Sequence, residues 1–219
     1  MEKVTPAYYA TNLRALTFGE MMRLGGLVNG LLGFVIGRFM PPQGRELMPT
    51  SYEEIEAQRT DIAPHILSVL EKIGEPFMAA GFREIGYQVM PNAPDDSGSI
   101  IYLSDCGEIV GLATVAKKNA PETGHVKVGA LCSYDREGHC LSVGNSRISL
   151  DPAPGNVVHR LPDKAPQDLL PIFRKYKQAS RQEFICFRDW PQVRASMEHD
   201  DARSFIHRRD VRKLFVPVP

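Results

Sequence analysis

Hydrophobic and polar residues alternate through the middle of the chain, which is the pattern expected of β-strands. Short connections rich in turn-forming residues separate the alternating segments, and strands joined in this way pair antiparallel as a meander. The segment 182–187 either forms a further short strand or begins another helix. The five segments that show the alternation are 82–90, 100–104, 109–116, 125–134 and 139–150.

Helical spacing appears on both sides of these strands. Residues 61–81 place apolar side chains at steps of 4, 3 and 4 from Ile66 to Phe77, which is one face of a helix. A second helix is expected over 165–180, and residues 190–214 are expected to be helical in part. The sequence therefore predicts an α+β fold, with an antiparallel five- or six-stranded meander sheet covered by helices on one face.

An apolar, glycine-striped segment precedes this domain. Residues 24–37 carry no charge, and helical spacing would align four glycines along one stripe. Such a stripe costs roughly 1 kcal/mol per glycine in a solvent-exposed helix, so a close neighbour is needed to compensate. We expect that neighbour to be a partner helix or lipid. The contact residues predicted for this helix are Gly26, Gly30, Gly33, Gly37, Leu27, Leu31 and Phe34.

The length of this segment leaves three alternatives open. Fourteen helical residues rise about 21 Å, which is less than the roughly 30 Å of a hydrocarbon core. The helix could span a bilayer with its flanking arginines at the headgroups, lie on the bilayer, or pack within the protein. Pro41 and Pro42 end it in each case. The predicted organisation is an apolar helical arm at 1–42, a polar linker at 43–60 and an α+β globular domain at 61–219.

Charge is balanced overall and uneven along the chain. The 219 residues contain 26 Lys and Arg and 26 Asp and Glu, so no global field favours nucleic acid. Basic residues are concentrated near the C-terminus, where they form either a surface for a protein or lipid partner or an ordinary solvated helix face. The residues of this predicted partner surface are Arg203, Arg208, Arg209, Arg212 and Lys213.

A group of Cys and His residues is a candidate for a zinc site or a catalytic dyad, namely Cys106, His125, Cys132, His139 and Cys140. A zinc site usually contains closely spaced ligand pairs, and here the nearest pair is adjacent in a strand and points to opposite faces. The hairpin register decides the relation of Cys132 to Cys140. A four-residue loop separates them and keeps the apolar positions together, whereas a three-residue loop with a bulge at Gly138 puts both on one face. The apolar match favours the four-residue loop, so the sequence predicts no catalytic residue, cofactor or metal.

These patterns predict a non-catalytic, membrane-associated accessory or protein-interaction subunit, anchored through the N-terminal helix. Its expected partners are another protein, through helix–helix contact, and a lipid bilayer. The first alternative is a soluble, cytoplasmic α+β domain that binds a small ligand. The second, less favoured alternative is a Cys/His-dependent enzyme. The hydrophobic content of 43% is that of a globular protein, and four cysteines are too few for a disulfide-stabilised scaffold.

Overall fold

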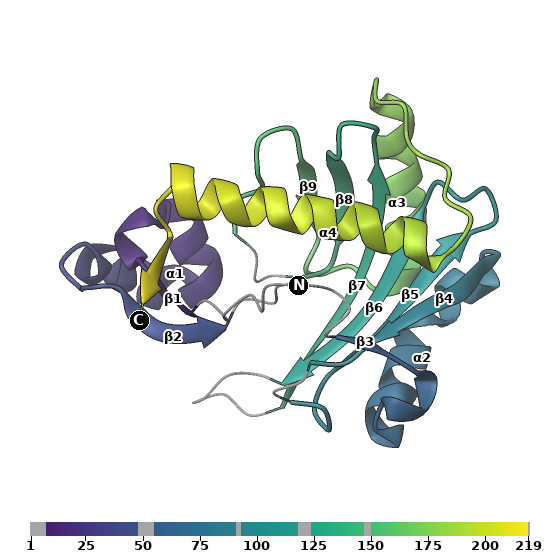
Figure 1. Cartoon of the computed structure of the whole chain (residues 1–219), viewed down its shortest axis with the longest axis horizontal. Helices are drawn as coiled ribbons and strands as arrows, with labels where there is room; N and C mark the ends of the chain where they lie inside the picture. Colours follow the sequence, from purple (N-terminus) through teal and green to yellow (C-terminus); the bar gives the residue numbers. More distant parts are fainter. Residues whose placement is uncertain (1–7, 48–54, 91–92, 118–123, 147–149, 219) are drawn as a thin grey trace, which may run out of the picture. The chain divides into compact units, whose positions relative to one another are not determined.

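The computed structural model describes residues 8–47, 55–90, 93–117, 124–146 and 150–218 (Figure 1). The chain divides into two compact units. Unit 1 contains residues 1–51, 147–154 and 201–219, and unit 2 contains residues 52–146 and 155–200. These units do not follow the predicted segments 1–42, 43–60 and 61–219, because the C-terminal residues belong with the N-terminal ones.

Unit 2 is built on a seven-stranded sheet with the order β3-β4-β5-β6-β7-β8-β9. The five predicted strands form its centre, β4 to β8, and pair antiparallel in sequence order. The strands are β3 (Glu56–Ala57), β4 (Phe82–Gln88), β5 (Gly98–Ser104), β6 (Val110–Lys117), β7 (His125–Tyr134), β8 (Cys140–Gly144) and β9 (Val157–Arg160). The α+β class is confirmed. The five- or six-stranded antiparallel meander is wrong, because two strands are added at the edges and β9 runs parallel to β8.

Helices cover both faces of this sheet, so the prediction of one covered face is also wrong. On one face lie α2 (Pro64–Ala79) and α3 (Pro166–Ala179), whose apolar side chains share a core with alternate residues of β5 to β8. On the other face lies the part of α4 (Trp190–Ile206) that belongs to unit 2 (Figure 1). The interior strand β5 is consequently buried on both sides, with Ile100 to Leu103 almost inaccessible to solvent.

Trp190 anchors α4 to the sheet. A Cβ atom on Gly86 of β4 would lie 2.8 Å from Cδ2 of the indole, so only glycine lets the ring lie against this strand. Val193 and Met197 continue the contact one and two turns later. The chain reaches Trp190 through an extended segment in which Phe184 forms an isolated bridge with Asp135, and not through the alternative strand or helix at 182–187.

Unit 1 contains a three-stranded antiparallel sheet with the order β10-β1-β2. Its small core contains Leu16, Met21 and Leu214. The C-terminal strand pairs with the N-terminal one, and the predicted polar linker supplies the third strand. The elements are β1 (Tyr8–Thr11), η1 (Leu13–Ala15), α1 (Phe18–Gly37), β2 (Gln43–Leu47), the end of α4, the π-helical turn η4 (His207–Val211) and β10 (Phe215–Val218).

Candidate functional site

Helix α1 is not one straight rod. Gly26 has non-helical backbone angles, φ 69° and ψ −172°, and divides the helix into a first arm, residues 18–25, and a second arm, residues 27–37. A side chain at this position would be strained, which is why the turn occurs at a glycine. Thr17 caps the first arm with a capping box. The Thr17 hydroxyl accepts from the Glu20 amide, and the Glu20 carboxylate accepts from the Thr17 amide.

The glycine stripe of the second arm faces the chain itself. A Cβ atom on Gly30 would lie 2.6 Å from the Met21 carbonyl oxygen, and one on Gly33 would lie 2.9 Å from Cε of Met21. One on Gly37 would meet Leu13 at 3.2 Å. The stripe therefore provides close contact, as the sequence indicates, but the neighbour is the first arm of the same helix. Of the predicted contact residues, Gly30, Gly33 and Gly37 are internal and Gly26 is the turn.

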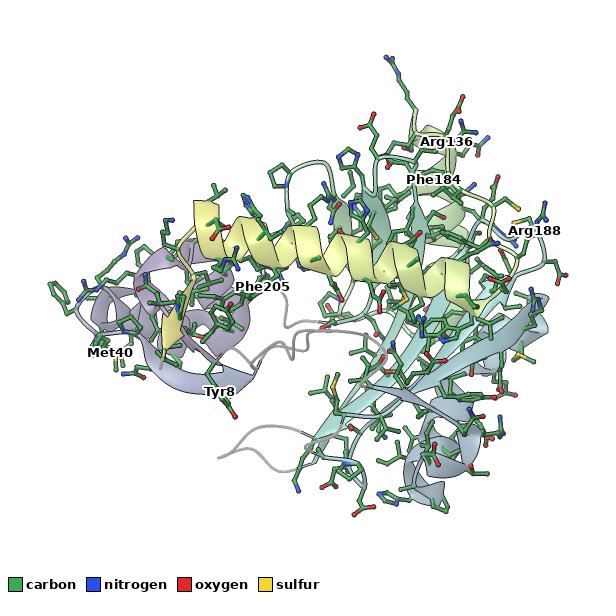
Figure 2. All side chains as sticks on the ribbon, in the orientation of Figure 1. Tyr8, Met40, Arg136, Phe184, Arg188 and Phe205 are labelled. Atoms are coloured by element: carbon green, nitrogen blue, oxygen red, sulfur yellow. The ribbon has the colours of Figure 1, made fainter. Side chains whose placement is uncertain are left out.

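The opposite side of the second arm is aliphatic and exposed, and we call it the outer face. Val28 is 76% exposed, Leu31 is 53% exposed and Phe39, just beyond the helix, is 80% exposed. The spacing puts these side chains within one helical face, because they recur at steps of three and four. The residues of the outer face are Val28, Leu31, Leu32, Val35, Ile36 and Phe39. Met40, labelled in Figure 2, marks the end of this segment.

Two other predicted contact residues have different environments. Phe34 is half-buried, since its ring packs edge-to-face on Phe18 at 5.4 Å and the Arg38 guanidinium lies 4.6 Å from the ring centre. The side chain of Leu27 lies outside the described part of the structure. Of the predicted residues, Leu31 alone is therefore placed on the outer face.

A buried ion pair connects the first arm to the C-terminal segment within unit 1. Glu20 is fully buried, and its carboxylate accepts from the Thr17 and Asp151 amides, both at 2.7 Å. The Arg212 guanidinium donates to both carboxylate oxygens, at 2.7 and 2.5 Å, and also to the Ala15 carbonyl. Burial alone would raise the Glu20 pKa, but the bonds from Arg212 and the two amides outweigh it and lower this pKa to about 2.

The depressed pKa predicts how unit 1 responds to acid. Glu20 titrates near 4.5 when unfolded and near 2 when folded, so its stabilisation is complete above pH 4.5 and is lost as the pH falls from 4.5 to 2. Hydrogen exchange of the α1 amides, corrected for intrinsic rates, should therefore accelerate over that interval. In Glu20→Gln this dependence should be absent. An equally steep dependence in that variant would contradict the assignment to Glu20.

The basic residues predicted as a partner surface are largely engaged within unit 1. Arg212 pairs with Glu20, Arg203 donates to the Pro154 carbonyl at 2.9 Å, and Arg209 forms two bonds to Asp210. Phe205, labelled in Figure 2, packs against Tyr9 and Phe215 and carries the Arg209 guanidinium over its ring. Arg208 also interacts with a neighbour, and Lys213 adopts φ 55° at the end of η4. The segment therefore contributes to folding, and its role as a partner surface stays a prediction.

The β7–β8 hairpin has the three-residue loop, so the predicted four-residue loop is wrong. Tyr134 pairs with Cys140 and Cys132 with Ser142, so the loop has three residues, 136–138. Gly138 has φ 78°, as a bulge at this position requires. The Asp135 carboxylate accepts from the Glu137 and His139 amides and fixes this turn. The prediction from apolar matching is wrong because α4 also buries the second face, so both faces accept apolar residues.

The structure does not bring all of the Cys and His candidates together at one point. Cys132 and Cys140 are buried together beneath α4. Contact with Cys132 and burial both raise the pKa of Cys140. A protonated, buried thiol is a poor nucleophile. His125 is seven residues from Cys132 along β7, which is more than about 20 Å. Among the described residues, no three His, Cys, Asp or Glu side chains are grouped to hold a metal ion.

A pocket of about 480 Å³ in unit 2 lies between α2 and α3. Phe77 and Leu170 line it, together with prolines from both helices, and Glu75 and Arg174 stand at its border. In the alternative function, a soluble domain that binds a small ligand, this pocket would be the binding site. That alternative stays a prediction.

Two residues were missed from the sequence, namely Glu20 of the buried ion pair and Cys186, whose thiol donates to the Cys106 carbonyl. Glu20 had a signal, since Thr17-Phe18-Gly19-Glu20 is a Thr-x-x-Glu capping box, and this motif also places the helix start at Phe18. Cys186 had none, because it stands alone in an irregular segment and its neighbours come from elsewhere in the chain.

Comparison with known proteins gives no relative to guide the assignment. No protein-family model, no curated protein and no solved structure matches the chain. Within the described residues, none of the helices has both the length and the apolar character that a membrane crossing needs.

Proposed function

We propose that this protein is an accessory protein that docks on the surface of an anionic membrane through the outer face of α1. The observation that carries the proposal is the exposure of six large apolar side chains on the second arm and just beyond it. A contiguous exposed apolar face of this kind typically marks an interaction or membrane surface.

The shape of α1 favours shallow insertion. The second arm has 11 residues and rises about 16 Å, far short of a bilayer core. A helix that lies in the interface plane buries its apolar face about 5–10 Å into the headgroup and acyl boundary. The first arm packs on the inner side of the second arm and is itself held by the buried Glu20–Arg212 pair, so the outer face is held in place before it meets lipid.

Charge around the outer face fits an anionic surface. The sequence of residues 21–45 contains no Asp or Glu; Arg23 in the first arm is paired with Asp151, and Arg38 is the basic residue that ends the second arm. Arg38 is exposed at the end of the second arm, next to the outer face. Basic residues near a membrane surface each contribute about 1 kcal/mol with anionic lipid.

Lipid is favoured over a partner helix for two reasons. The glycine stripe, which would admit a partner helix closely, is occupied by Met21 and Leu13. The outer face also consists of Leu, Val and Ile with a single Phe, whereas protein interfaces are enriched in aromatic residues, Met and Arg. Lipid chains need no matching side-chain geometry and accept such a surface.

Vesicle flotation tests the proposal. The full chain should float with vesicles containing anionic lipid and bind neutral vesicles more weakly. Leu31→Asp and Val35→Asp should each lower the affinity at least tenfold, because they place a charge where an apolar side chain is buried in lipid. Met78→Asp is the matched control, since Met78 is an exposed apolar residue on α2, and this variant should bind like the wild type.

Two results would overturn the proposal. One is a wild-type chain that does not float with anionic vesicles, or Asp variants that float as well as the wild type. The other is a wild-type dimer that Leu31→Asp converts to a monomer, which would assign the outer face to protein contact.

A further inference from the structure

Two exposed cysteines lie against each other in unit 2. Cys106 is in the turn between β5 and β6, and Cys186 is in the extended segment 184–189, which we call the strap. The Cys186 thiol donates to the Cys106 carbonyl oxygen at 2.9 Å, although the two residues are 80 positions apart. Phe184 and Arg188, labelled in Figure 2, lie on the strap on either side of Cys186.

The backbone fixes this proximity. The Phe187 amide donates to the Gly107 carbonyl at 2.9 Å, and the Ile185 amide donates to the Tyr134 carbonyl at 2.8 Å. A Cβ atom on Gly107 would lie 2.8 Å from Cys186 Sγ, so a glycine is needed for the strap to approach the turn. Hydrogen bonds on both sides of Cys186 therefore hold its thiol over the turn.

The printed contact bounds the Cα separation of the two cysteines close to the range of a disulfide. A carbonyl oxygen is about 2.4 Å from its own Cα, so Cys186 Sγ is at most about 5.3 Å from the Cys106 Cα. Adding the Cα–Sγ span of Cys186 limits the Cα separation to about 8 Å, and disulfides span about 4.4–6.8 Å. A small approach of the strap and rotation of the Cys106 side chain away from Ser104, now 3.3 Å from its Sγ, would complete the bond.

We propose that Cys106 and Cys186 are a site of oxidative modification, at which a hydroperoxide forms a disulfide between the strap and the β5–β6 turn. The Cys106 thiolate attacks the distal oxygen of the hydroperoxide, the O–O bond breaks, and the products are a sulfenic acid and an alcohol, or water from hydrogen peroxide. The Cys186 thiol loses its proton, and the thiolate attacks the sulfenic sulfur. The S–O bond breaks, and the hydroxide that leaves takes up a proton to form water. Two thiols are oxidised and one peroxide is reduced.

Cys106 is the attacking residue for a local reason. Ser104 Oγ, which accepts from the Ile109 amide at 3.1 Å, lies 3.3 Å from Cys106 Sγ, so its hydroxyl can donate to a Cys106 thiolate. The Cys186 hydrogen is instead directed to a carbonyl oxygen, which suits the resolving thiol. The second pair, Cys132 and Cys140, is buried and diagonal across β7 and β8, where Cα atoms are about 7–8 Å apart and access is closed.

Thiol titration and peptide mapping test this proposal on the full chain. After treatment of the reduced protein with hydrogen peroxide, the thiols titrated in denaturant should fall from four to two, and a 106–186 linked peptide should appear. The oxidised chain should melt about 5–10 °C higher, because the bond closes a loop of about 80 residues. Dithiothreitol should reverse both changes.

Serine variants give the controls. Cys186→Ser should form no linked peptide and should accumulate a sulfenic acid on Cys106 that dimedone traps. Cys106→Ser should form neither product, and Cys132→Ser should still form the 106–186 bond. Retention of all four thiols, a bond between Cys132 and Cys140, or only intermolecular disulfides would each overturn the proposal.

Discussion

Replacing Glu20 with alanine is expected to lower the stability of unit 1 by about 3–5 kcal/mol. The carboxylate is fully buried and accepts from two backbone amides and from Arg212. Its removal leaves the Arg212 guanidinium without its counter-charge where it is only 13% exposed, and leaves two amides unpaired. The protected amides of α1 should exchange at least a hundredfold faster, which hydrogen-exchange mass spectrometry measures directly.

Two further variants separate this effect from a general loss of charge. Glu75→Ala removes an exposed glutamate from α2 and should change stability by less than about 0.5 kcal/mol. The double variant Glu20→Ala with Arg212→Met should recover much of the loss, because no unpaired charge stays buried. Unchanged exchange of the α1 amides in Glu20→Ala would show that the ion pair does not hold α1.

Gly74→Ala is expected to destabilise unit 2 by about 3 kcal/mol, although alanine is the better helix former by about 1 kcal/mol. A Cβ atom on Gly74 would lie 1.9 Å from the Tyr102 hydroxyl oxygen and 2.3 Å from Cζ. Tyr102 is buried on the interior strand β5 beside Phe77, so its ring has no room to move away. Urea unfolding followed by the fluorescence of Trp190, the only tryptophan, reports on this unit.

The contact partner and a matched glycine provide the controls. Adding Tyr102→Phe should recover only part of the loss, since Cζ stays at 2.3 Å. Gly129→Ala introduces the same methyl group at a site where the nearest atom is 3.4 Å away, and should be close to neutral. If Gly74→Ala is also neutral, the packing of α2 on β5 is not as described.

The strands of unit 2 were predictable where neighbours in sequence are neighbours in space. Strands β4 to β8 have alternation and short loops, and these fix their pairing. Strand β9 follows a proline-rich segment and pairs in parallel with β8, a choice that depends on distant packing. The run Ile100-Ile101-Tyr102-Leu103 does not alternate, and this was a signal for a strand buried on both faces that the prediction of one covered face did not use.

In unit 1, the turn of α1 and the pairing of the terminal strands could not be predicted from the sequence. The glycine stripe of α1 was predicted to meet a partner helix or lipid, whereas Gly30, Gly33 and Gly37 meet the chain itself; spacing alone does not tell a glycine that packs, such as Gly30, from one that turns, such as Gly26. Pairing of β1 with β10 joins residues more than 200 positions apart, and no local pattern marks it. The outer face was missed as a distinct surface because the whole segment reads as apolar until the turn at Gly26 is known.

The most direct measurement of the central proposal is the depth of the outer face in lipid. Val35→Cys, with Cys106→Ser and Cys186→Ser, presents one accessible thiol for an NBD fluorophore, since Cys132 and Cys140 are buried. On adding anionic vesicles, we predict that the emission shifts to shorter wavelength and is quenched by nitroxides on the lipid chains, while the same label at Lys72→Cys on α2 does not respond. An unchanged emission at residue 35, or an equal response at residue 72, would contradict docking through α1.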